Sequence, residues 1–250
     1  MKLRAYIEKF SRGRIFKRTL PQKFGGLQIF VSPEAGLRYY KLNLNNIDHV
    51  VTNTVDLFVT PNDVIWDVGA NLGLFSLCAL GKEKTCSAIC FEPDIFMCEL
   101  LRRSTERNNL PISILPFAAA ESFNFMDFEI AERSRATNHL AIVDGSTQTG
   151  GTRTTKKVPV IDLNTILTYF PKPTFLKVDV EGAELIVIKG AKNILDEKPK
   201  ILIEVNNSSY KSIMEELINR NYSCYDANLL PELVGIDLSS LTDNILALPK

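Results

Sequence analysis

From Val64 onward, short apolar runs alternate with longer segments whose apolar residues recur at helical spacing. The apolar runs are VIWDV, CSAICF, ISILPFAAA, FLKVDV, ILIEV and a terminal NILAL, each typical of a buried β-strand. The segments between them predict helices near residues 72–81, 93–110, 183–195 and 209–220. Strands that alternate with helices favour an α/β fold, in which a mostly parallel sheet carries helices on both faces.

Two regions depart from this rhythm. Residues 2–18 have the pattern of a basic amphipathic helix, and residues 27–59 indicate short strands, with LQIFV and VDLFV the clearest. Residues 121–160 are polar, with alternating segments, FNFMDFEI and TTKKVPV, around a Gly/Thr-rich tip. We therefore expect residues 1–50 to form a basic helix and short strands packed on the core. Residues 51–250 are expected to form the main domain, with an inserted hairpin or lid at about 121–160.

The charge and the cysteine content of the chain disfavour several classes of function. The 250 residues carry a formal net charge of zero, so no overall field attracts nucleic acid, although residues 1–23 are basic and could contact an anionic partner or a membrane surface. No apolar run approaches the ~20 residues that cross a bilayer, and no secretory signal is visible. The five cysteines form no C-x-x-C pair, which disfavours a zinc site or a disulfide framework. We expect a cytoplasmic protein.

The turn after the first buried strand, DVGANLG, has the features of a cofactor site. Its glycines permit a tight strand-to-helix turn and close approach of a ligand to the backbone. Asp67 precedes the first glycine, where a carboxylate suits a ligand amino group and repels a pyrophosphate. Glu92 ends the next strand, where an acid binds ribose hydroxyls. These features favour S-adenosylmethionine (SAM) over NAD, and a nicotinamide oxidoreductase remains the alternative.

Charged residues also follow the fourth and fifth buried strands of this part of the chain. Lys177, Asp179 and Glu181 alternate in FLKVDVEGAE, and Glu204 ends ILIE. The carboxyl ends of parallel strands meet at one edge of the sheet, where ligands bind. Glu184 comes one turn into a helix and is expected to satisfy the helix start.

Taken in order, VIWDVGANLGLFSL, CFEPD, VPVIDLNTIL, FLKVDVEGAELIVIKGAKNIL and ILIEVN resemble the FkbM family of SAM-dependent methyltransferases over about residues 50–210. The resemblance implies a class I methyltransferase fold, Rossmann-like, with a seven-stranded, mostly parallel sheet whose last strand is antiparallel. The implied activity is methyl transfer, usually to oxygen and often on sugars or other hydroxylated metabolites, with S-adenosylhomocysteine as product.

The same resemblance assigns the cofactor residues. The methionine part of SAM would lie against the glycine turn, the ribose against the end of the second strand, and the adenine against the segment after the third. The residues so placed are Asp67, Gly69, Ala70, Asn71, Gly73, Glu92, Pro93, Ala118 and Ala119. Asn71 stands where the commoner motif has a glycine.

Methyl transfer to a hydroxyl requires a group that accepts the proton. Asp179 is the first candidate base and Glu181 the second, with Lys177 paired to one of them. His139, in ATNHL, is a further candidate.

A magnesium-assisted variant stays open, because O-methyltransferases of this fold can bind Mg²⁺ at these strand ends. Asp179, Glu204 and Asn206 would supply hard oxygen ligands. The acceptor is expected to be a small molecule or glycan. Nucleic acid is disfavoured because no basic stripe interleaved with aromatics is present. A SAM-binding scaffold without turnover is the non-enzyme alternative.

Overall fold

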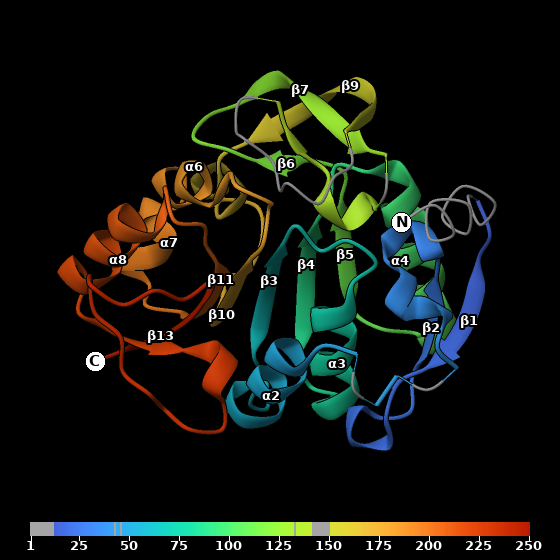
Figure 1. The fold of residues 1–250 in the computed structure, drawn as a ribbon. Helices are drawn as coiled ribbons and strands as arrows, with labels where there is room; N and C mark the ends of the chain where they lie inside the picture. Colours follow the sequence, from blue (N-terminus) through green and yellow to red (C-terminus); the bar gives the residue numbers. More distant parts are fainter. Residues whose placement is uncertain (1–12, 43, 46, 133, 142–150) are drawn as a thin grey trace.

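The computed structural model describes residues 13–250 except for 43, 46, 133 and 142–150. Its centre is a seven-stranded sheet in the order β12-β13-β11-β10-β3-β4-β5 (Figure 1). The strands are β3 (Val64–Val68), β4 (Ser87–Phe91), β5 (Ile112–Leu115), β10 (Phe175–Val178), β11 (Lys200–Glu204), β12 (Tyr222–Asp226) and β13 (Asn244–Pro249). Six of them run in the same direction, and β13 runs antiparallel to both of its neighbours, β11 and β12. The predicted mostly parallel sheet with an antiparallel last strand is confirmed.

Helices cover both faces of this sheet, so its strands are apolar on both sides. On β3, Ile65 packs into one core while Trp66 and Val68 pack into the other. The first core includes side chains of α2 (His49–Phe58), α3 (Leu74–Lys82) and α4 (Ile95–Asn108). The second includes those of α5 (Leu163–Ile166), α6 (Glu184–Lys189), α7 (Lys192–Asp196) and α8 (Tyr210–Asn219). In the described part of the chain, no helix has the length and apolar character needed to cross a membrane.

The N-terminal region differs from the prediction in two places. Most of the helix expected over residues 2–18 lies outside the described residues, and within them β1 (Phe16–Thr19) is a strand, paired antiparallel with β2 (Gln28–Val31). VDLFV belongs to helix α2 and is not a strand. Asp48 caps that helix by accepting a hydrogen bond from Val51 N at 3.1 Å, and Val50, Thr54 and Val55 are buried at helical spacing.

Short 3₁₀ turns link these elements. Near the N-terminus they are η1 (Gln22–Phe24), η2 (Pro33–Ala35) and η3 (Leu37–Tyr40), and further along the chain they are η4 (Arg135–Thr137) and η6 (Ala227–Leu229).

A second sheet lies beyond the carboxyl end of the central strands (Figure 1). Its order is β6-β9-β7-β8, with β6 (Ala118–Ala119), β7 (Asn124–Ala131), β8 (His139–Leu140) and β9 (Thr152–Ile161). β7 and β9 pair antiparallel from Asn124 opposite Val160 to Ala131 opposite Thr152. ISILPFAAA is therefore not one strand. β5 ends at Leu115 and β6 joins the second sheet, because Pro116 has no N–H for the central ladder.

The helix predicted over residues 183–195 is divided into α6 and α7. The break is at Gly190, where a Cβ atom would lie 2.0 Å from the carbonyl oxygen of Ala120. The backbones at Gly190 and Ala120 therefore pass too close for a side chain, which explains the glycine at this position. The contact places the segment after β6 against the helix pair.

Candidate active site

A cavity of about 290 Å³ opens at the carboxyl ends of β3, β4 and β10, beneath the second sheet. Seven of the nine residues predicted to bind the cofactor line it: Gly69, Ala70, Asn71, Glu92, Pro93, Ala118 and Ala119. Lys177, Asp179 and Glu181 line the same cavity. Asp67 and Gly73 do not belong to its lining.

The glycine turn forms one wall of the cavity through its backbone. Gly69 has φ of 73°, and a Cβ atom there would lie 1.8 Å from the carbonyl oxygen of Asp179. Gly69 N and Ala70 N both donate to Phe91 O at 3.0 Å, which ties the turn to the end of β4. Asn71 has φ of 54°, and its Oδ1 accepts a hydrogen bond from Leu72 N at 2.8 Å. The turn thus presents main chain to the cavity and brings β3 against β10.

Glu92 fixes the other side of this turn. Its Oε2 accepts a hydrogen bond from Asn71 N and its Oε1 accepts one from Asp94 N, both at 2.7 Å. Burial raises the pKa of Glu92 to about 8, although both backbone donors oppose the shift. Each carboxyl oxygen has a second lone pair, so Glu92 can hold the turn and still accept a hydrogen bond from a ligand hydroxyl.

Asp67 lies behind the turn and is fully buried. Its Oδ2 accepts a hydrogen bond from Ser76 Oγ at 2.8 Å, and its Oδ1 lies 3.3 Å from Lys177 Nζ. The geometry therefore gives Asp67 a contact with α3 and with Lys177. It does not place the carboxylate at the cavity surface, where a ligand amino group would reach it.

Lys177 connects the two predicted halves of the site. Its buried Nζ donates to Gly69 O at 2.8 Å and lies 3.4 Å from Asp179 Oδ2. Burial opposes the charged form, but the carboxylates of Asp179 and Asp67 outweigh it and raise the pKa of Lys177. One ammonium group therefore contacts two carboxylates and the glycine turn. The sequence predicted a partner among Asp179 and Glu181, and the contacts with Asp67 and Gly69 were not predicted.

Further carboxyl groups surround Asp179, whose side chain is 36% exposed. Burial, followed by the charges of Asp179 and Glu184, raises the pKa of Glu181 to about 8. The charge of Asp179, followed by burial, raises the pKa of Glu204 to about 9. The end of β10 is thus a place where negative charge exceeds the positive charge available to balance it.

Glu184 satisfies the turn before α6. Its Oε1 accepts hydrogen bonds from Gly182 N at 2.8 Å and from Val180 N at 3.3 Å. This is the helix-start role expected from its position, and it orders the backbone that carries Glu181.

His139 is not brought to the cavity. Its neighbours Asn138 and Leu140 line the cavity, whereas His139 does not, because successive side chains of β8 point to opposite faces. Its ring instead places Nδ1 3.2 Å from Thr137 O and Nε2 3.8 Å from Glu129 Oε2.

The proposed magnesium ligands are not assembled either. Asn206 Oδ1 accepts hydrogen bonds from Ser208 N and Ser209 N at 3.0 Å, which places it in the turn before α8, and Asn206 lines neither cavity of the site. In the described ranges, no group of three or more His, Cys, Asp or Glu side chains is arranged to hold a metal ion.

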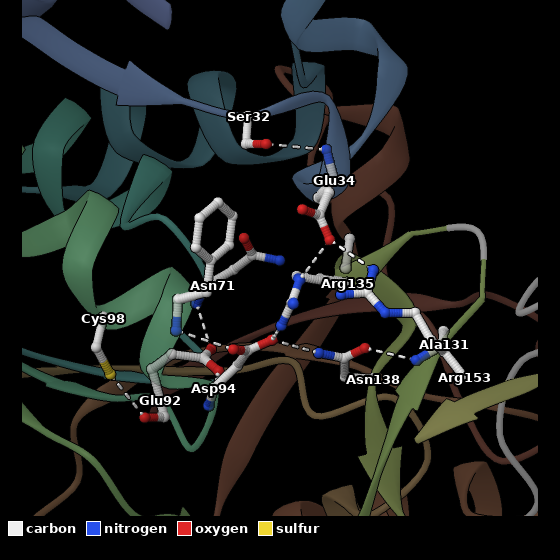
Figure 2. Close-up of polar contacts among 12 residues, drawn as sticks. Ser32, Glu34, Asn71, Glu92, Asp94, Cys98, Ala131, Arg135, Asn138 and Arg153 are labelled. Carbon is white, nitrogen blue, oxygen red and sulfur yellow. Dashed lines mark hydrogen bonds and ion pairs between the residues drawn. The ribbon is translucent and has the colours of Figure 1, made fainter. Parts of the chain in front are cut away.

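A buried ion network escapes the sequence analysis (Figure 2). Arg135, from the insert, contacts Glu34 at 2.8 Å and Asp94 at 2.6 Å. Asn138 Nδ2 donates to Asp94 at 2.8 Å, and Arg153 contacts Glu34 at 2.8 Å. Burial raises the pKa of Glu34, but hydrogen bonds from Arg135, Gly13 N and Arg153 lower it overall. The network joins the N-terminal region, the start of α4 and the insert above the cavity. In the sequence, the sign of this network is that two arginines, Arg135 and Arg153, flank the Gly/Thr-rich tip of the insert.

A second cavity of about 350 Å³ adjoins the first. The two share six lining residues: Arg38, Asp48, Val51, Lys177, Asp179 and Glu204. The second extends between the start of α2, the carboxyl end of β11 and the start of β13, and its remaining polar lining residues are His49, Asn228, Asp243 and Asn244.

Known proteins resemble this chain in sequence. The family model described as Methyltransferase FkbM domain matches residues 67–224, more than half of the chain. The curated protein Hexuronic acid methyltransferase AglP, from Haloferax volcanii, is 27% identical over 145 residues. That alignment covers 58% of this chain and 56% of AglP, so the chain spans little more than half the length of this relative.

Solved structures resemble it more distantly. A methyltransferase from Pyrococcus furiosus is 13% identical, with a TM-score of 0.46 over 99% of this chain and 96% of that one. The protein TYW2 of P. horikoshii, solved in complex with MeSAdo, is 10% identical, with a TM-score of 0.48 over 89% and 67%. The assignment of an α/β fold with a mostly parallel sheet rests on the strand order described above. From the match over residues 67–224, this protein belongs to the FkbM family of SAM-dependent methyltransferases.

Proposed function

We propose that this methyltransferase transfers the methyl group of SAM to a hydroxyl oxygen of a sugar or another hydroxylated metabolite. The observation that carries the proposal is the position of Asp179. Its partly exposed carboxylate stands where the two cavities meet, 3.4 Å from the ammonium of Lys177. A relative that shares 27% of its aligned residues is named for methylation of a hexuronic acid, which supports a sugar acceptor.

The first cavity fits SAM. When bound there, SAM supplies a methyl group carried on a positively charged sulfur. Glu92 would hold the ribose hydroxyls, because it lines the cavity and its carboxyl oxygens keep spare lone pairs. The main chain of Gly69–Asn71 would accept the methionine part at close range, and Phe117, Ala118 and Ala119 would border the adenine.

Asp179 would accept the proton of the attacking hydroxyl. A hydroxyl is a weak nucleophile, and a positioned base raises the rate by about 10²–10⁴. SAM would supply the methyl group and keep the electron pair of its carbon–sulfur bond, while the hydroxyl proton would move to the Asp179 carboxylate as the new oxygen–carbon bond formed. Glu181 is less suited, because its pKa of about 8 leaves it largely protonated at neutral pH. Lys177 would limit the build-up of negative charge around Asp179.

The donor half of the proposal is tested by thermal shift. SAM and S-adenosylhomocysteine should each raise the Tm, since a ligand that binds only the folded state stabilises it. Glu92→Ala should weaken this rise by removing the predicted ribose ligand. A protein whose Tm is unchanged by either compound would not be the enzyme proposed here.

The chemical step is tested with Asp179→Asn. This variant should lower methyl transfer by about 100-fold or more while keeping the thermal shift with S-adenosylhomocysteine. Asp127→Asn is the matched control, because Asp127 also pairs with a lysine, Lys157 at 2.9 Å, but lines neither cavity. Full activity of Asp179→Asn would refute the assignment of the base.

The acceptor can be found by mass spectrometry of metabolites and glycans from a deletion strain and its parent. The parent should contain a species heavier by one methylene group, and incubation of the deletion-strain extract with enzyme and labelled SAM should restore it. A scaffold without turnover would give the thermal shift but no such product. A nicotinamide enzyme would instead show a thermal shift with NAD.

A further inference from the structure

The second cavity begins where the first ends. Asp179 is one of the residues that line both cavities, so a molecule within the second can bring a hydroxyl to its carboxylate. Its far wall is polar and ordered. Asn228 Nδ2 donates to Asp243 Oδ1 at 2.8 Å, and Asn244 Nδ2 donates to the same oxygen at 3.0 Å. The cavity therefore has a proton acceptor at one end and a built hydrogen-bonding wall at the other.

The lining of this cavity contains more acidic than basic side chains. The acids are Asp48, Asp179, Glu204 and Asp243, and the described cations are Arg38 and Lys177, with His49 as the titratable ring. Both cations are already engaged. Arg38 pairs with Asp48 at 3.0 Å, and Lys177 lies 3.3 Å from Asp67 and 3.4 Å from Asp179.

The remaining acids, Glu204 and Asp243, lack a basic partner within ion-pair distance in the described part of the chain. The raised pKa of Glu204, caused first by the charge of Asp179, reflects the same excess of negative charge. Carboxyl and amide oxygens accept hydrogen bonds from hydroxyl or ammonium groups, whereas a carboxylate on a ligand would be repelled by the unpaired carboxylate of Asp243.

We propose that the second cavity is the acceptor subsite and that it selects a sugar without an acidic group, favouring an amino sugar over a uronic acid. Asp243 would set this selection, because its carboxylate would repel an acidic sugar and attract an ammonium group. Glu204 lies on the neighbouring strand and is largely protonated at neutral pH, so it would offer a hydrogen bond and not a charge. The inference rests on the proposed function, because it takes Asp179 as the point where acceptor and donor meet.

The test measures binding of three probes to the full chain saturated with S-adenosylhomocysteine. The probes are the methyl glycosides of glucosamine, glucose and glucuronic acid. The dissociation constant of each is measured by ligand-observed NMR titration. The unmodified protein should bind the glucosaminide best and the glucuronide worst. Asp243→Lys should shift the ratio of the two dissociation constants toward the glucuronide by about fivefold or more. Glu215→Lys, at an exposed position of α8 outside both cavities, is the matched control and should leave the ratio unchanged.

The outcomes separate this inference from the proposed function. If S-adenosylhomocysteine does not raise the Tm of the unmodified protein, the donor site is refuted, and the methyltransferase proposal with it. If S-adenosylhomocysteine binds but the glucuronide binds as well as the glucosaminide, the acidic acceptor subsite is refuted. The same holds if none of the probes binds, or if Asp243→Lys and Glu215→Lys behave alike.

Discussion

At the ends of β3 and β4 the site is made of backbone, and at the ends of β10 and β11 it is made of charged side chains. The first region packs a left-handed glycine against the neighbouring strand, and its carboxylate, Glu92, is held by two backbone N–H groups. The second region places Asp179, Glu181 and Glu204 around one ammonium group.

This difference separates two kinds of requirement. The region at β3 and β4, which we propose binds the methyl donor, depends on a backbone conformation that a single residue can permit or forbid. The region at β10 and β11, which we propose binds the acceptor, depends on a balance of charges from several strands, so each residue contributes only part of it. Single substitutions should therefore act sharply in the first region and gradually in the second.

The largest effect is expected from Gly69→Ala. The new Cβ would lie 1.8 Å from Asp179 O, so β3 and β10 could not keep their spacing, and the free energy of unfolding should fall by more than about 4 kcal/mol. Gly13→Ala is the matched control, because its φ of 71° is nearly the same but no atom of the described residues lies within 4 Å of the position that its Cβ would take. Chemical denaturation measures both. Equal losses would show that conformation alone, and not the close approach to β10, matters at Gly69.

A smaller loss is expected from Lys177→Met. Removing the ammonium leaves the fully buried Asp67 without its charge partner, which should cost about 3 kcal/mol of unfolding free energy. Adding Asp67→Asn should recover part of this loss. Lys172→Met, which breaks an exposed pair with Glu197, should cost less than about 1 kcal/mol. If Lys172→Met and Lys177→Met are equally mild, Lys177 does not link the two regions.

The smallest effect is expected from Glu204→Gln and appears as a pH dependence. The folded state raises the pKa of Glu204 from 4.5 to about 9, so the folded protein binds this proton more tightly than the unfolded chain. The resulting stability is fully present below about pH 4.5 and is lost as the pH rises to about 9.

Between pH 5 and 9, the Tm of Glu204→Gln should therefore fall less than that of the unmodified protein, by about 1–2 °C once solvent exposure is allowed for. Glu215→Gln should follow the unmodified protein throughout. If the Tm of all three proteins fell equally with rising pH, the raised pKa of Glu204 at the end of β10 would be refuted.

Local patterns were enough to predict the sheet, the glycine turn and the charged strand ends. An apolar run indicates directly that a segment is buried. In DVGANLG and DVEGAE, neighbouring residues are enough to indicate a turn at the end of a strand. The failure at VDLFV has a specific cause. Its valines suit a strand, but Asp48 upstream caps a helix and the core selects helical spacing at Val50 and Val55.

Contacts between distant segments could not be predicted in this way. Arg135 meets Glu34 across 101 residues of sequence, and no motif marks either residue. His139 shows the same limit in another form, because a residue in a polar insert can point to either face of a two-residue strand. The second cavity brings together residues from α2, β11 and the segment before β13, so only the folded chain defines it.

The inner position of β13 has a consequence for how the protein is made. Asn244–Pro249 lies between β11 and β12, and β12 pairs with no other strand of the central sheet. During synthesis, β12 must wait with its edge unpaired until residues 244–249 have emerged, and during that interval it is open to wrong partners. Strands β3, β4 and β5, at whose ends we propose that SAM binds, precede β13 in the chain by more than 100 residues, so they emerge well before the sheet is complete.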